Sequence, residues 1–181
     1  LFYIVKDLAD DTRHLGRETV KSFGVRSRFV HFEFFRLLSD HEGLGKKGDL
    51  MALEVNMRPS GGFTPDMINF ARETDVYKIW ADMVAYDSTQ KPVGTHHFCA
   101  FAGLRDGKDF ALTPDDIIEK YDDHLKMVER MPDALADAMG NQMYLATFDT
   151  EEELHTFFAD VTRQKEPDVS VASETAETLE S

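Results

Sequence analysis

The chain has 181 residues, with 34 acidic and 20 basic side chains and a formal net charge of −14 at pH 7. So acidic a balance argues against binding to nucleic acid or to anionic membranes, and the single cysteine excludes an internal disulfide framework or a zinc cluster built from cysteines. No stretch reaches the roughly 20 apolar residues of a membrane helix, so we expect a folded cytoplasmic protein.

The first elements predicted along the chain are a helix and a hairpin. The chain starts with the apolar sequence Leu-Phe-Tyr-Ile-Val, which is typical of a protein interior, so we expect a piece of a longer polypeptide. Apolar residues at helical spacing predict a helix over 6–23 that ends before Gly24. Strand-like residues over 28–38 and 50–57, with a polar loop between them, predict an antiparallel hairpin with a long connection.

Two further helices are predicted after the hairpin. Thr64, followed by a proline and an acid, is typical of a helix start with a capping hydroxyl, and a second helix is predicted from about Asp75. From Val76 to Val84 apolar residues recur every three or four positions, with Trp80 among them. We therefore expect this face of the second helix, including Trp80, to be buried.

The rest of the chain alternates between strands and helices, which favours an α+β fold with antiparallel strands. Cys99 lies between Phe98 and Ala100 and is predicted to be a small core residue. Thr150 and Glu153 form a capping box that opens the last helix. The remaining predicted elements are strands over 93–102, 126–131 and 141–149, a short helix from Thr113 and another over 132–140.

A carboxylate, an amide and a guanidinium alternate with apolar side chains along the second hairpin strand, which leads into a Pro-Ser-Gly-Gly turn. Glu54, Asn56 and Arg58 share one face, because successive strand side chains point to opposite faces. The apolar residues between them are expected to face the core: Leu53, Val55 and Met57. Glu33 occupies the neighbouring strand between two phenylalanines.

Two carboxylates and an amide are ligands suited to Mg²⁺, which prefers oxygen donors. Residues two apart in a strand, such as Glu54 and Asn56, are separated by about 6.6–6.8 Å, and the next strand lies about 4.8 Å away. Glu33 is therefore within reach of the same ion. The alternative is a solvated strand face with a cross-strand ion pair, and the aromatic neighbours of Glu33 and the Gly-Gly turn weigh against it.

The motifs HFEFF (31–35) and LEVNMRPSGG (53–62) resemble the ATP-grasp superfamily of ligases, which includes biotin carboxylase and carbamoyl-phosphate synthetase. The resemblance extends over about 23–86. It implies that Glu33, Glu54 and Asn56 bind Mg²⁺ or Mn²⁺ ions that hold the phosphates of ATP, with Glu54 bridging two ions.

The same resemblance assigns roles to the residues that follow. Arg58 would be catalytic, facing the carboxylate substrate or its acyl phosphate. Backbone N–H groups of Ser60, Gly61 and Gly62 would meet the same anion. His31 shares the face of Glu33 and could orient a carboxylate.

The implied organisation is the C-terminal half of an ATP-grasp domain over 1–92, a small α+β subdomain over 93–164 and a disordered acidic tail over 165–181. The phosphate-binding lysines and glycine-rich lid of such ligases lie upstream of the two-glutamate hairpin. We therefore expect the isolated chain to show little or no ATP-dependent activity.

The resemblance predicts a part of an ATP- and Mg²⁺-dependent ligase that activates a carboxylate or bicarbonate as an acyl phosphate for attack by an amine or another nucleophile. Two alternatives remain: a non-catalytic module serving in assembly or regulation, and a hairpin that binds a divalent metal without nucleotide. The carboxylate, the nucleophile and the pathway stay open. So does the oligomeric state, although related enzymes are often dimers.

Overall fold

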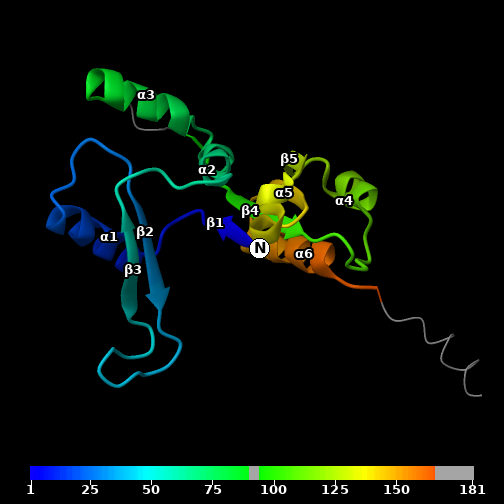
Figure 1. The fold of residues 1–181 in the computed structure, drawn as a ribbon, viewed down its shortest axis with the longest axis horizontal. Coiled ribbons are helices and arrows are strands. Elements are labelled where there is room, and N and C mark those ends of the chain that lie inside the picture. Colours follow the sequence, from blue (N-terminus) through cyan, green and yellow to red (C-terminus); the bar gives the residue numbers. More distant parts are fainter. Residues whose placement is uncertain (90–93, 166–181) are drawn as a thin grey trace, which may run out of the picture. The chain divides into compact units, whose positions relative to one another are not determined.

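A computed structural model describes residues 1–89 and 94–165, and in these residues it contains six helices and six strands (Figure 1). The predicted α+β class is confirmed. The helices are α1 (Asp10–Ser22), α2 (Thr64–Arg72), α3 (Val76–Tyr86), α4 (Pro114–Tyr121), α5 (Asp133–Met139) and α6 (Glu151–Thr162). The strands are β1 (Phe2–Ile4), β2 (His31–Arg36), β3 (Leu50–Asn56), β4 (Phe98–Leu104), β5 (Leu125–Arg130) and β6 (Gln142–Phe148).

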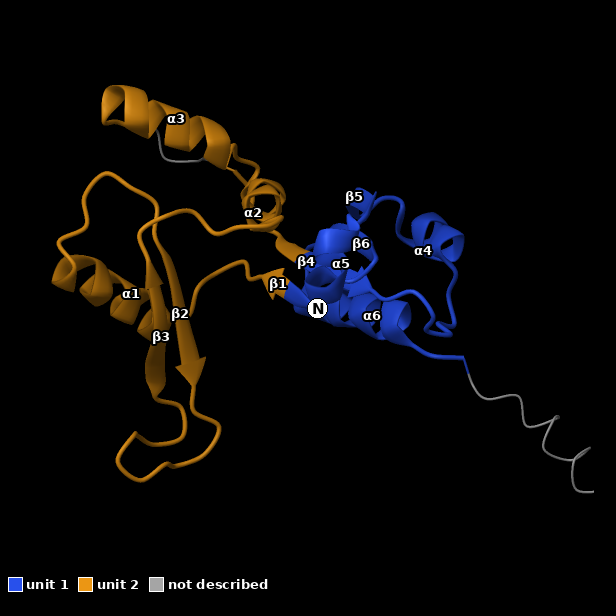
Figure 2. Ribbon diagram, in the orientation of Figure 1, with its two compact units in different colours: residues 1–2, 100–181 blue, residues 3–99 orange. Residues whose placement is uncertain are grey.

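The chain divides into two compact units, one formed by residues 3–99 and the other by residues 1–2 with the chain from Ala100 onward (Figure 2). The predicted boundary between 92 and 93 lies outside the described residues, as does the predicted tail beyond Lys165. Within the described residues, no helix is both long enough and apolar enough to cross a membrane.

The hairpin of β2 and β3 is the element of residues 3–99 that carries the predicted site. The two strands pair antiparallel, as expected, and lie side by side in Figure 1. Their long connection is closed by backbone hydrogen bonds between Leu37 and the residues Gly48 and Asp49. At the end of β2, Arg36 donates to Asp11 of α1 over 2.6 Å, and this contact lowers the pKa of Asp11 to about 2.

One face of the hairpin is apolar and is turned towards α1. Phe32 of β2 and Val30 before it line a groove of about 410 Å³ with residues of α1 such as Gly16 and Val20. Val55 is the cross-strand partner of Phe32 and so shares this face. Because side chains alternate along a strand, the neighbours of Phe32 and Val55 point to the opposite face.

The start of α2 and the apolar face of α3 differ from the sequence prediction, whereas the start of α3 agrees with it. Thr64 is the first residue of α2 and does not cap it, since Phe63 occupies the capping position and makes no side-chain bond there. Asp75 does cap α3, because its carboxylate accepts from the Lys78 backbone N–H over 2.9 Å. The predicted buried face of α3 is wrong at Trp80 and Val84, which are 45% and 72% exposed, because α3 buries only its first residue in the described structure.

The unit that begins at Ala100 has a core of fully buried side chains, among them Leu145, Leu154 and Phe157. The larger sheet has the strand order β1-β4-β6-β5, with β5 and β6 antiparallel. Glycine at position 103 lets β4 approach the end of α5, because a Cβ there would lie 1.8 Å from the carbonyl oxygen of Met139. Capping boxes open α4 at Thr113 and α6 at Thr150, the second as predicted.

A polar contact joins α4 to α6 at the edge of this core. Asp160 of α6 accepts hydrogen bonds from the Lys120 ammonium and from the Tyr121 hydroxyl, the latter over 2.6 Å. Both hydrogen bonds lower the pKa of Asp160, and the bond from the Lys120 ammonium has the larger effect. Burial, together with the bond to Asp160, raises the pKa of the Tyr121 hydroxyl.

Candidate functional site

The polar face of the hairpin comprises His31, Glu33, Glu54 and Asn56, and the strand register brings these residues together. Glu33 lies directly opposite Glu54, and His31 lies directly opposite Asn56. Because directly opposed residues share a face, all four side chains project from the same side of β2 and β3. The predicted set Glu33, Glu54 and Asn56 is thus gathered on one face.

A β-bulge next to this pair sets the register. Phe34 pairs with Ala52 while Glu33 pairs with Glu54, so Leu53 has no partner of its own on β2. Such an extra residue bends the strand and turns side chains away from the regular alternation, and bulges are frequent beside active sites. The expectation that Leu53 faces the core is wrong, since its side chain is 56% exposed.

The two glutamates repel each other in the absence of a cation. Directly opposed like charges destabilise a strand pair. Glu33 has only a 3.6 Å contact with Nε2 of His31, and the side chains of these two residues are 41% and 32% exposed. Two carboxylates placed in this way favour an added cation, which would remove the repulsion.

His31 and Asn56 each hold a buried polar atom without a hydrogen-bond partner among the described residues. The atoms are Nδ1 of His31 and Nδ2 of Asn56. Buried polar atoms are normally paired, so two unpaired atoms on one face call for an explanation, and a polar ligand would supply one. Rotation of the Asn56 carboxamide by 180° exchanges its nitrogen and oxygen, which would present an oxygen ligand instead.

The residues on this face do not form a complete metal site by themselves. No group of three or more His, Cys, Asp or Glu side chains that could hold a metal occurs in residues 1–89 or 94–165. The hairpin supplies two carboxylates and one amide, fewer than a protein-only metal cage needs. Mg²⁺ commonly binds through one or two carboxylates together with phosphate oxygens and water, and this donor set suits that mode.

Arg58 and the glycine turn follow the hairpin after β3 has ended. The Arg58 side chain is exposed, and its Nη1 donates to the carbonyl oxygen of Pro59 over 3.0 Å. Gly61 and Gly62 are exposed, and Gly62 adopts a positive φ of 60°, which favours glycine. These residues therefore lie within a few positions of the polar face and remain accessible to a ligand.

Sequence reasoning found the residues of this face but missed how they meet. Alternation along β3 placed Glu54 and Asn56 together, and the bulge at Leu53 carried no sequence signal, because neither glycine nor another turn residue marks it. The unpaired atom of His31 was also not predictable, since hydrogen-bond satisfaction depends on residues distant in the sequence.

The chain was compared with models of known protein families and with curated proteins, and neither comparison found a match. Its function therefore has to be argued from the hairpin and its chemistry.

Proposed function

We propose that the β2–β3 hairpin is the cation- and phosphate-binding element of an ATP-dependent carboxylate ligase of the ATP-grasp type. The observation that carries the proposal is the direct opposition of Glu33 and Glu54, next to the pair formed by His31 and Asn56. In this proposal Glu33, Glu54 and Asn56 hold Mg²⁺ or Mn²⁺, which neutralises the charge of the ATP phosphates during transfer to a carboxylate or bicarbonate.

The protein's own side chains have separate tasks in this proposal. Glu33 and Glu54 bind and orient the cations, and the rotated carboxamide of Asn56 adds a neutral oxygen ligand. Arg58 has a planar guanidinium that can bind both oxygens of a carboxylate or acyl phosphate, and its side chain is exposed and so accessible to such an anion. The exposed backbone at Gly61 and Gly62 adds N–H donors for the same anion.

The first test measures Mn²⁺ binding through the electron paramagnetic resonance signal of the free ion. We expect the chain to bind Mn²⁺, Glu33→Gln and Glu54→Gln to abolish binding, and Asn56→Ala to weaken it. Glu129→Gln is a matched control, because Glu129 is an exposed strand glutamate opposite Met143 rather than opposite a second acid. No Mn²⁺ binding, or equal binding by wild type and Glu54→Gln, would refute the cation site.

A second titration separates the ligase proposal from a simple metal hairpin. Mn²⁺ is titrated into the wild type and, as a separate sample, into the Arg58→Ala variant. Each titration is run with and without a non-hydrolysable ATP analogue. The ligase proposal expects the analogue to tighten Mn²⁺ binding, because its phosphate oxygens complete the shell of the ion. Binding that ignores the analogue would favour a metal hairpin without nucleotide.

A further inference from the structure

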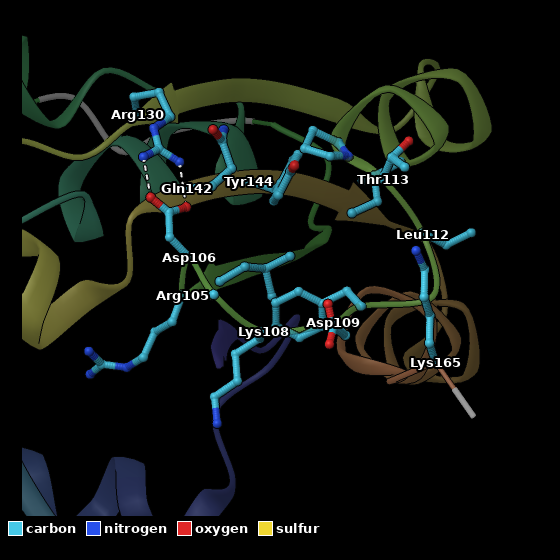
Figure 3. A pocket seen from close by; sticks show the side chains of 15 residues that line it. Arg105, Asp106, Lys108, Asp109, Leu112, Thr113, Arg130, Gln142, Tyr144 and Lys165 are labelled. Carbon is cyan, nitrogen blue, oxygen red and sulfur yellow. Dashed lines mark hydrogen bonds and ion pairs between the residues drawn. The ribbon is translucent and has the colours of Figure 1, made fainter. Parts of the chain in front are cut away.

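A pocket of about 440 Å³ lies in the unit that begins at Ala100, far along the sequence from the hairpin (Figure 3). Its volume lies within the range of small-molecule sites. Part of the wall is apolar, formed by Phe110, Leu112 and Ile117. The pocket therefore offers an apolar compartment together with the polar groups described next.

Tyr144 of β6 lines this pocket and carries a hydroxyl without a partner. Its side chain is fully buried, and the described residues provide no hydrogen-bond partner for its hydroxyl oxygen. Burial raises the pKa of this hydroxyl, against the influence of the Arg130 charge, so it stays protonated at neutral pH and can donate a hydrogen bond. A buried donor without an acceptor is destabilising, and such a group calls for an explanation.

The pocket wall is rich in cations although the chain as a whole is strongly acidic. Four basic side chains and two acidic side chains line it: Arg105, Lys108, Arg130, Lys165, Asp106 and Asp109. Arg130 binds Asp106 through two parallel hydrogen bonds of 2.8 and 2.6 Å, so this pair is neutral and geometrically fixed. In Figure 3 that pair stands at one end of the pocket, and Lys165 stands near Thr113 at the other.

We propose that this pocket binds a small amphipathic carboxylate. The apolar part of the ligand contacts Phe110, Leu112 and Ile117, and its carboxylate accepts the hydrogen bond that Tyr144 leaves unused. The excess of basic side chains in the wall attracts the negative charge. Among the described residues Arg130 is paired with Asp106, whereas Lys165, like Arg105 and Lys108, forms no ion pair with a carboxylate. Because the Tyr144 hydroxyl is buried, contact with it involves a shift of a lining side chain.

The site is independent of the proposed ligase function, since it uses none of the hairpin residues. An acidic ligand is favoured over a basic one because a protonated tyrosine donates its hydrogen and because basic side chains outnumber acidic ones in the wall. An apolar ligand without an acceptor would leave the hydroxyl unpaired.

The test uses benzoate as the probe, with benzamide as its uncharged counterpart, in an NMR titration of the whole chain. We expect benzoate to shift signals of the pocket residues and to bind more tightly than benzamide. Tyr144→Phe removes only the hydroxyl and is expected to weaken benzoate binding about tenfold, as for loss of one hydrogen bond to a charged group. The same variant is expected to raise the Tm of the free protein, because the unpaired donor is gone.

A second variant keeps the test decisive if Tyr144→Phe alters the fold. Lys165→Met is expected to weaken benzoate binding and leave benzamide binding unchanged. Lys126→Met is its control, because Lys126 is an exposed residue of β5 outside the pocket. The proposal is overturned if benzamide binds as well as benzoate, if benzoate shifts no pocket signal at its highest soluble concentration, or if Tyr144→Phe lowers the Tm and leaves binding intact.

Discussion

The Glu54→Gln variant should be more stable than the wild type without a divalent cation and less stable than the wild type when the cation is added. The Cβ atoms of directly opposed strand residues are about 5 Å apart, and we take this separation for the two carboxylates as well. Because the Glu33 side chain is 41% exposed, the repulsion is screened nearly as in bulk water and amounts to about 0.8 kcal/mol. Without a divalent ion, we therefore expect Glu54→Gln to raise the free energy of unfolding by about 0.8 kcal/mol.

Mn²⁺ should change the sign of this difference. At an ion concentration ten times its Kd, binding adds about 1.4 kcal/mol to the stability of the wild type. Glu54→Gln lacks a ligand and gains almost nothing, so the wild type becomes the more stable protein by about 0.6 kcal/mol. High salt screens the repulsion, so the advantage of Glu54→Gln without the ion would shrink.

The assay is urea unfolding followed by the fluorescence of Trp80, which is the single tryptophan of the chain and belongs to the same unit as the hairpin. Glu129→Gln is again the control, and its response to Mn²⁺ should match that of the wild type. The reasoning is refuted if Glu54→Gln is less stable than wild type without the ion, or if both proteins gain equally from Mn²⁺.

Three further substitutions probe the packing and charges of the fold. Gly103→Ala should lower the free energy of unfolding by about 3 kcal/mol, because β4 cannot retreat from a backbone carbonyl without disrupting the sheet; chemical denaturation measures this, and a loss below about 1 kcal/mol would contradict the close contact. Gly16→Ala should instead stabilise α1 by about 0.4–1 kcal/mol, since no atom lies within 4 Å of the added methyl group; an unchanged or lower Tm would speak against this. Asp160→Ala should cost about 1.5–3 kcal/mol at pH 7, because the hydrogen bonds from Lys120 and Tyr121 are lost. The folded pKa of Asp160 is lowered, so its contribution is present above the unfolded pKa of about 3.9 and disappears as the pH falls through the folded pKa. The difference between wild type and Asp160→Ala should therefore narrow in acid, and a difference independent of pH would count against the ion pair.

The sequence was sufficient wherever the interaction is local. The capping box at Thr150 and Glu153 was predictable, because its two hydrogen bonds join residues three positions apart. Alternation along β3 placed Glu54 and Asn56 on one face for the same reason, since the period of a strand is a property of the backbone. The burial of Cys99 followed from its apolar neighbours and is confirmed.

Predictions failed where the surroundings of a residue decide its environment. The apolar stripe of α3 predicted burial, yet Trp80 is 45% exposed, because periodicity shows which face is apolar and not whether another element covers it. Thr64 resembles a capping residue, but the helix begins at Thr64 itself and the hydroxyl is one position too late to cap it.

The amino-acid sequence by itself determined the α+β class, the order of the elements after β1 and the identity of the polar residues on the hairpin, because local hydrogen bonding and side-chain periodicity depend on neighbouring residues. Strand β1 was not predicted. Only the tertiary structure decided that Glu33 meets Glu54 across a bulge at Leu53 and that the hydroxyl of Tyr144 is buried without a partner. Strand register and hydrogen-bond satisfaction arise from contacts between residues distant in the chain, and no local pattern specifies them.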